Sequence, residues 1–195
     1  MRRFAVVGHR AATSPDFPLE DLPGSAGRLD VLVRCVNAAF VVSHGIRRDT
    51  EITLVLQGPP RPPRTIRLAG DRLQRLNPDE RSTAARLRRA LEYEGAVEKE
   101  ITEGVHTGSR SFADVVGSLA PLYVLAEDGK DLRDTDFPSD PAFLLSDDED
   151  LTADEAQLAA DHAAGRVSAG PLTLHSDQVI TLVHNELDRR DRRAA

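Results

Sequence analysis

Short apolar runs separated by polar, Gly-rich and Pro-rich stretches make up the first part of the chain. The run Phe4–Val7 has the length and composition of a buried strand. Residues 11–27 are rich in Pro, Ser, Asp and Gly, which predicts a loop. The alternating segment 51–56, a Pro-rich turn and the segment 65–68 predict a β-hairpin.

The longest apolar pattern runs from about Arg28 to Ser43 and predicts a helix. Apolar residues recur every three or four positions, and the remaining positions are also mostly apolar. A helix that is apolar nearly all round must be covered on two sides. It therefore crosses the middle of the protein or lies in a subunit interface, and Gly45 is a natural stop.

The stretch between this helix and residue 120 is less clearly patterned. Asn77–Glu80 reads as a helix start with Asn77 as the cap and Pro78 at the first helical position. Residues 94–108 are weakly patterned, and residues 111–119 predict a short helix.

Short strands and helices alternate from residue 121 onward. The predicted strands are 122–125, 142–145 and a strand end at 167–170. A capping box of Thr152 and Glu155 predicts a helix to about Ala164, and the last helix covers about 176–190. This alternation is typical of a parallel α/β sheet.

Composition limits the class of protein. The chain has 195 residues, of which 40% are apolar, so it can bury a core. No apolar run reaches the roughly 20 residues that span a bilayer, and the apolar stretch at the amino terminus is too short for a signal peptide. The single Cys35 cannot form an internal disulfide, which fits a reducing cytoplasm.

The net charge of −7 is divided unevenly along the chain. Residues 1–90 contain 16 Arg, no Lys and 9 acidic residues, a net charge of +7; residues 91–195 contain 7 Arg, 2 Lys and 23 acidic residues, a net charge of −14. A basic half on an acidic protein suggests a polyanionic partner. Adaptation to salt would explain the acidic residues and the scarcity of Lys, but not the one-sided distribution of Arg.

Common catalytic signatures are absent. The sequence has no G-x-x-x-x-G-K-[ST], G-x-G-x-x-G or G-x-S-x-G motif, and its six His residues have no metal-ligand spacing. A hydrolase or metalloenzyme therefore has little support, and we expect no metal.

Two basic segments are candidates for chemistry. Arg28 and Asp30 lie in the first turn of the apolar helix, where N–H groups and a guanidinium suit a phosphate and a carboxylate could accept a proton. A dipole-favoured Asp paired with a neighbouring Arg explains the same pattern, and residue types alone favour it. Arg47 and Arg48 could likewise hold a phosphate or form a solvated basic corner.

A third candidate segment, residues 169–176, joins a predicted strand to the last helix. Ligands of open parallel sheets bind outside the carboxyl ends of the strands, where Leu125 and Ser146 are also predicted. Small residues would let the backbone approach a ligand closely, although an ordinary strand–helix connection has the same composition.

Several of these blocks together resemble the archaeal tRNA (pseudouridine-54 N1)-methyltransferases of the SPOUT superfamily. The resemblance covers nearly the whole chain in the right order, and the acidic, Lys-poor composition is similar to that of a halophilic archaeal member. The blocks are Asp21–Asp30, Ser43–Asp49, Asn77–Arg81, Pro171–His175 and Ile180–Asn185.

The resemblance implies an α/β fold, a SPOUT-type parallel sheet with helices on both faces and a deep trefoil knot near the carboxyl terminus. Residues 1–195 would form a single domain, with an Arg-rich, RNA-facing part at 1–120 and a knotted, cofactor-binding part at 121–190. The protein would be a cytoplasmic homodimer that transfers a methyl group from S-adenosylmethionine to N1 of pseudouridine 54 in the T-loop of tRNA.

The resemblance also implies site residues. Many members have Gly where Ser146 stands and Cys where Val179 stands, which alters the approach of the backbone at the first position and argues against an essential thiol at the second. The implied cofactor-binding residues are Leu125, Ser146, Ala169, Gly170, Pro171, Leu172, Thr173, Leu174 and Val179.

Asp30 would accept the N1 proton or orient the base, and Arg28 would hold a phosphate or stabilise negative charge. Arg47, Arg48 and Arg110 would be further RNA contacts. Because aromatic residues make up only 4% of the chain, we expect these charges to carry much of the RNA affinity and binding to weaken with added salt.

Two alternatives remain from the residues and the resemblance. A related SPOUT methyltransferase could act on a pseudouridine of small-subunit ribosomal RNA. A non-catalytic RNA-binding assembly protein could retain the fold, although the intact Arg28 and Asp30 argue against it.

Overall fold

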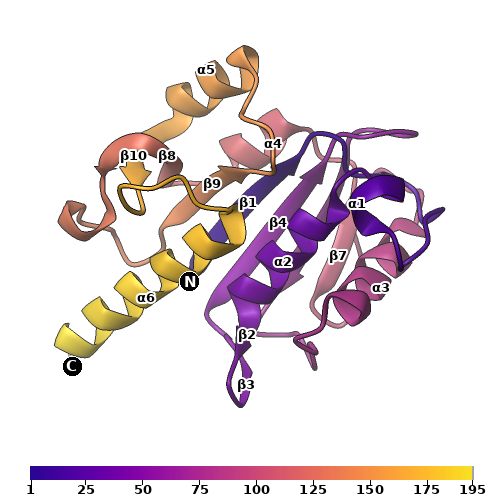
Figure 1. The fold of residues 1–195 in the computed structure, drawn as a ribbon, viewed down its shortest axis with the longest axis horizontal. Coiled ribbons are helices and arrows are strands. Elements are labelled where there is room, and N and C mark those ends of the chain that lie inside the picture. The colour runs from indigo at the N-terminus through magenta and orange to yellow at the C-terminus, as the bar shows by residue number, and fades with distance from the viewer. Residues whose placement is uncertain (195) are drawn as a thin grey trace.

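The computed structural model describes residues 1–194, and the side chains of residues 1–191 (Figure 1). Eight strands form one sheet in the order β10-β8-β9-β1-β4-β5-β7-β6. The strands are β1 (Arg2–Gly8), β4 (Thr50–Leu56), β5 (Arg64–Ala69), β6 (Lys99–Thr102), β7 (Val105–Gly108), β8 (Leu122–Asp131), β9 (Ala142–Ser146) and β10 (Ala163–Ser168), and a separate small hairpin pairs β2 (Val41–Val42) with β3 (Gly45–Ile46).

The sheet is mixed. Strands β10, β8, β9, β1 and β4 run parallel to their neighbours, whereas β5, β7 and β6 extend the sheet in antiparallel pairing. The predicted parallel pairing is confirmed for the first five strands, and the predicted β-hairpin is confirmed by the antiparallel pair β4–β5. The sheet is mixed rather than purely parallel because this hairpin reverses the chain direction and β7 and β6 continue the antiparallel pairing. Residues 94–108 contain β6 and β7; the edge strand β6 shows little apolar pattern because it buries little.

Helices cover both faces of the sheet, as predicted. They are α1 (Leu22–Ser25), α2 (Leu29–Phe40), α3 (Glu80–Leu91), α4 (Phe112–Gly117), α5 (Ala153–His162) and α6 (Ser176–Ala194), with a 3-10 turn at Leu132–Asp134. Alternate residues of β1 point to opposite faces: Phe4 and Val6 pack in the core under α2, α3 and α6, whereas Ala5 and Val7 pack under α4 and α5. Figure 1 shows α2 and α6 in front of the sheet and α4 behind it.

Helix α2 crosses the middle of the protein, which is the first of the two predicted alternatives. It packs on the sheet between α3 and α6, and most of its residues, including the polar Asp30, are buried. Within residues 1–194, none of the helices has both the length and the apolar character needed to cross a membrane.

The helix starts follow local hydrogen bonding. Asp79, not Asn77, caps α3, because its carboxylate accepts the Ser82 N–H at 2.8 Å, so the predicted start was wrong by two residues. The predicted capping box of α5 is confirmed: the Thr152 hydroxyl accepts the Glu155 N–H, and the Glu155 carboxylate accepts the Thr152 N–H.

Candidate functional site

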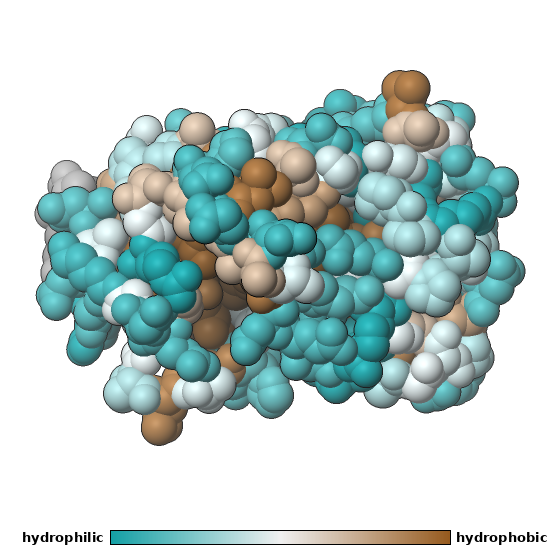
Figure 2. Space-filling view, turned by 90° about the horizontal axis from the view of Figure 1, so that it is seen from above, coloured by the Kyte–Doolittle hydropathy of each residue, from teal (hydrophilic) through white to brown (hydrophobic). Residues whose placement is uncertain are grey.

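A cavity of about 610 Å³ lies at the carboxyl ends of β8, β9 and β10, against the segment that leads into α6. This is the edge where ligands of open α/β sheets bind, and the volume lies within the range of small-molecule sites. Figure 2 views the molecule from this edge and shows apolar surface recessed in a hollow. Of the predicted cofactor-binding residues, all but Pro171 line the cavity: Leu125, Ser146, Ala169, Gly170, Leu172, Thr173, Leu174 and Val179.

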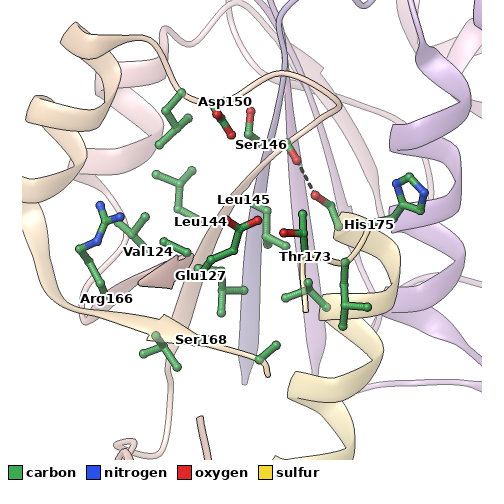
Figure 3. A pocket seen from close by; sticks show the side chains of 18 of the residues that line it. Val124, Glu127, Leu144, Leu145, Ser146, Asp150, Arg166, Ser168, Thr173 and His175 are labelled. Atoms are coloured by element: carbon green, nitrogen blue, oxygen red, sulfur yellow. Dashed lines mark hydrogen bonds between the residues drawn. The ribbon is translucent and has the colours of Figure 1, made fainter. Parts of the chain in front are cut away.

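The cavity combines an apolar base with an acidic rim. Val124, Leu144 and Leu145 bring apolar side chains to it from β8 and β9 (Figure 3). Arg166 also lines it, but its guanidinium is paired with Asp128. A pocket of this charge favours a cationic ligand. The acidic lining residues are Glu127, Asp128, Asp147, Asp148, Glu149 and Asp150.

Two serine side chains hold the polypeptide around this cavity. The Ser176 hydroxyl, at the start of α6, donates to the Ser146 carbonyl at 2.5 Å. The Ser146 hydroxyl itself donates to the Glu149 carbonyl within the β9–α5 loop. A Cβ atom built on Gly170 would meet nothing within 4 Å, so the backbone there is open to the cavity.

Arg28 and Asp30 lie together beside the cavity. The Arg28 Nε donates to Asp30 Oδ1 at 3.1 Å, and its Nη1 donates to Asp148 Oδ2 at 2.9 Å. Since Asp148 lines the cavity, Arg28 joins the start of α2 to the cavity rim. Within residues 1–194, Arg28 is the only non-glycine residue with a positive φ, 65°. Such a conformation costs on the order of 1–3 kcal/mol and is frequent at functional sites.

Asp30 is a buried carboxylate held by two arginines, with 5% of its surface exposed. Its Oδ2 accepts from Arg34 Nη1 at 2.9 Å and from Arg28 Nη2 at 3.3 Å. Burial raises the pKa of Asp30, but hydrogen bonds and charges from Arg28 and Arg34 outweigh burial and leave the pKa below its ordinary value. Asp30 is therefore ionised at neutral pH and is a weak base.

A histidine that the motif search did not identify lies next to this rim. His9 directly follows β1, and its Nδ1 lies 2.9 Å from Asp147 Oδ1 while its Nε2 lies 3.0 Å from Glu155 Oε2. The His9 backbone N–H also donates to Asp147 Oδ2 at 2.9 Å. Neighbouring parallel strands bring these groups together, because Val7 of β1 pairs with Ser146 of β9. His9 and Asp147 each come within two residues of those paired positions, so the sequence places each of them just after a strand, and the pairing of the two strands brings them together.

The electrostatics of this cluster are consistent with a charged ring. Burial lowers the pKa of His9, but its hydrogen bonds to Asp147 and Glu155 outweigh burial and place the pKa above 6.5. Burial raises the pKa of Glu155, whereas hydrogen bonds from the Thr152 N–H, Gln57 and His9 bring it below its ordinary value. The cluster is thus an imidazole between two carboxylates that favour its protonated form.

The three arginines expected to contact RNA lie away from the cavity lining. Arg47 donates to both oxygens of Asp188, at 3.0 and 2.7 Å, and Arg110 donates to the Asp114 carbonyl and the Ser118 hydroxyl. Arg48 donates through Nη1 to two backbone carbonyls, and it lines a second cavity of about 630 Å³ together with Arg75.

Within residues 1–194, no group of three or more His, Cys, Asp or Glu side chains is arranged to hold a metal ion. Cys35 lies in the core on α2, and burial raises the pKa of its thiol far above the ordinary value.

The chain matches known proteins over nearly its full length. A family model described as "Putative SAM-dependent RNA methyltransferase" matches residues 1–192. A tRNA (pseudouridine(54)-N(1))-methyltransferase of Methanocella arvoryzae is 46% identical over 192 residues, which cover 97% of this chain and all of the relative. An enzyme of the same name from Halobacterium salinarum is 48% identical over 96% of each chain.

The fold is also similar to a solved structure. Archaeoglobus fulgidus Nep1 bound to S-adenosylhomocysteine matches with a TM-score of 0.67 over 97% of this chain and 98% of the other, at 15% identity, a likeness of fold alone. The length and identity of the sequence matches decide the family: this chain belongs to the SAM-dependent RNA methyltransferase family that contains the archaeal tRNA (pseudouridine(54)-N(1))-methyltransferases.

Proposed function

We propose that this protein transfers a methyl group from S-adenosylmethionine to N1 of pseudouridine 54 in the T-loop of tRNA. The observation that carries the proposal is the 46–48% identity, over nearly full length, to archaeal proteins of that name. The cavity at the carboxyl edge of β8–β10 provides the matching donor site, because eight of the nine residues expected there line it. The names of these relatives favour tRNA over the ribosomal RNA alternative.

The residues of the cavity fit S-adenosylmethionine chemically. The donor carries a sulfonium and an ammonium group, which suit the acidic rim, and an adenine ring, which suits an apolar base such as Leu144 and Leu145. The donor supplies an activated methyl group. Leu125, Ser146, Val179 and the segment 169–174 would hold it; Pro171 would act by shaping that segment, since it does not line the cavity.

Arg28 and Asp30 are the proposed catalytic residues. Asp30 is held by Arg28 and Arg34 and has a lowered pKa, which favours a role in orienting Arg28 and the base over direct proton removal. Arg28, held at the cavity rim by Asp148, would stabilise the negative charge that spreads to a carbonyl oxygen as N1 releases its proton to water. Positioning for in-line transfer would supply much of the rate.

Arg47, Arg48 and Arg110 remain proposed RNA contacts. Arg48 is the strongest of the three because its side chain is exposed and lines the second cavity, whose lining contains no Asp or Glu. Arg47 would have to share its guanidinium with Asp188. Phosphate contacts of this kind make RNA binding weaken steeply as salt is added.

The finer architecture is also part of the proposal. The chain leaves β10 at the sheet edge, returns past the end of β9 through the Ser176–Ser146 hydrogen bond, and enters α6 beside α2. This course supports a trefoil knot in residues 121–190. The 73% exposure of Leu172 beside the cavity supports a homodimer in which a partner covers it, and the buried, unpaired Cys35 suits the cytoplasm.

Three measurements test the proposed function. Calorimetry of the purified protein with S-adenosylmethionine should show binding; no affinity would overturn the donor site and favour a non-catalytic RNA-binding protein. Methyl transfer should require a T-loop RNA with pseudouridine at position 54, and the same RNA with uridine is the control. Mass spectrometry of tRNA and ribosomal RNA from a deletion strain should show the methyl group missing from tRNA only.

A further inference from the structure

A largely buried histidine, His9, lies against Asp147 of the cavity lining. Both of its ring nitrogens face carboxylate oxygens, Asp147 Oδ1 at 2.9 Å and Glu155 Oε2 at 3.0 Å. A neutral imidazole has one N–H and one lone pair, so it would point a lone pair at one of the two carboxylates. Only the imidazolium donates to both, and the geometry is therefore that of a charged bridge.

The bridge is largely withdrawn from water. The side chain of Asp147 is fully buried and that of His9 is 10% exposed. The charged groups that act on the ring are Asp147 from the β9–α5 loop and Glu155 from α5. The neutral amide of Gln57, which directly follows β4, donates to the other oxygen of Glu155 at 2.8 Å.

The bridge holds Asp147, the middle one of three consecutive residues, 146–148, that line the cavity. Ser146 accepts the hydrogen bond from the start of α6, Asp147 accepts both the ring and the backbone N–H of His9, and Asp148 accepts Arg28. These three consecutive residues all line the cavity, whereas His9 does not. A shift of Asp147 would therefore move the cavity wall and the anchor of Arg28 together.

We propose that His9, as an imidazolium, is a positioning residue that holds the loop 146–148 and thereby shapes the methyl-donor site and aligns Arg28 with it. The inference rests on the proposed function of that cavity. His9 touches neither donor nor RNA and acts through Asp147.

The direction of the pH dependence follows from the bridge. The bridge is intact below the ordinary histidine pKa of 6.5 and is lost as the pH rises through the pKa of His9, which is raised above that value. Donor affinity should therefore fall on the alkaline side by about tenfold, the effect of losing one charge-assisted hydrogen bond.

The test is the dissociation constant of S-adenosylmethionine, measured by calorimetry from pH 6 to alkaline pH. His9→Gln should bind more weakly than wild type at pH 6, and the gap should close as the pH rises; the ratio of the two constants cancels titration of the donor itself. His184→Gln, a buried histidine at the other end of the fold, is the matched control and should keep the wild-type profile. A constant ratio of wild type to His9→Gln across this range would overturn the inference.

A second measurement does not depend on the donor or on the folding of the His9 variant. Nitrogen-15 NMR of the imidazole rings should show both His9 nitrogens protonated at pH 6, and Asp147→Asn should move the midpoint of that titration to lower pH. A neutral His9 ring at pH 6 would overturn the bridge. Absence of donor binding by wild type, with a charged His9 ring, would instead overturn the proposed function.

Discussion

Two histidines, the partly exposed His9 and the buried His184, have opposite charge preferences. His9, after the carboxyl end of β1, faces two carboxylates, and its pKa lies above 6.5. His184, on α6, packs edge-on against Phe4 and beside Arg2, and its pKa is lowered to about 3 by burial and by the charges of Arg47 and Arg2. Burial acts in the same direction on both rings, so the neighbouring charges decide which form each ring adopts.

The same comparison separates the two ends of the molecule by role. Near His184, Arg2 and Arg47 both pair with Asp188 and so tie the amino-terminal half to α6. Near His9, Arg28 and Arg10 both pair with Asp148 at the cavity rim. Part of the Arg excess in the amino-terminal half is therefore neutralised by the acidic half of the same chain, which reduces the share of it that can bind RNA.

Among these variants, Arg28→Ala should cause the largest loss of methyl-transfer rate, which would locate catalysis at the end of the molecule that contains the cavity. Loss of one group that stabilises developing charge costs about 10²–10³ in the transfer rate. Single-turnover methylation of a pseudouridine-54 T-loop, with thermal unfolding alongside, measures this. Arg34→Ala, which removes the other partner of Asp30, is the matched control and should lose less activity; equal losses would mean that Arg28 acts only by holding Asp30.

Asp30→Asn should slow methyl transfer by a smaller factor, because the amide keeps the shape of the side chain but loses the charge that holds Arg28. If Asp30 orients Arg28 and the base and does not remove the proton itself, the pH–rate profile of Asp30→Asn should keep the wild-type shape at lower rates. Loss of an ionisation from that profile would identify Asp30 as the base.

Arg2→Met should lower the stability but leave donor affinity unchanged, in contrast to changes at the cavity end. Arg2 is buried and pairs with Asp188 and Asp191, so we expect a loss of about 1–3 kcal/mol in the free energy of unfolding. Urea denaturation measures the loss and calorimetry measures the affinity. A change in donor affinity would mean that the two ends are coupled through α6.

The two histidines should contribute slopes of opposite sign to the dependence of the free energy of unfolding on pH. The His184 contribution is present above pH 6.5 and is lost as the pH falls toward its folded-state pKa of about 3. The His9 contribution is present below pH 6.5 and is lost as the pH rises through its raised pKa. Urea denaturation across pH should therefore show a flatter acid limb for His184→Gln and a flatter alkaline limb for His9→Gln.

Cys35→Ala should have the smallest effect on stability and activity, since Cys35 takes no part in the ion pairs near His9 or in those near His184. The thiol is fully buried in α2, so the change should cost about 1 kcal/mol of stability and leave methyl transfer unaltered. Loss of activity in a folded variant would show that a thiol is needed after all.

The elements with strong local signals were predictable from the sequence. The apolar pattern of α2 and the Thr152–Glu155 capping box predicted the right helices, and nearly all of the expected donor-site residues line one cavity. Strands β6 and β7 were missed because each has only four residues, too few for a clear alternation, and the edge strand β6 also buries little. The start of α3 was missed because Asn77 and Asp79 are both good caps, and only backbone geometry selects Asp79.

The sequence by itself determined most of the strands and helices, the α/β class and the family, because apolar periodicity, capping residues and motif order are local properties. Only the tertiary structure decided which charges meet. Asp147 and Glu155 lie 138 and 146 positions from His9 along the chain. The parallel pairing of β1 with β9 is what brings His9 to these carboxylates. Charge states and ion pairs depend on distances across the fold, and no local pattern contains those distances.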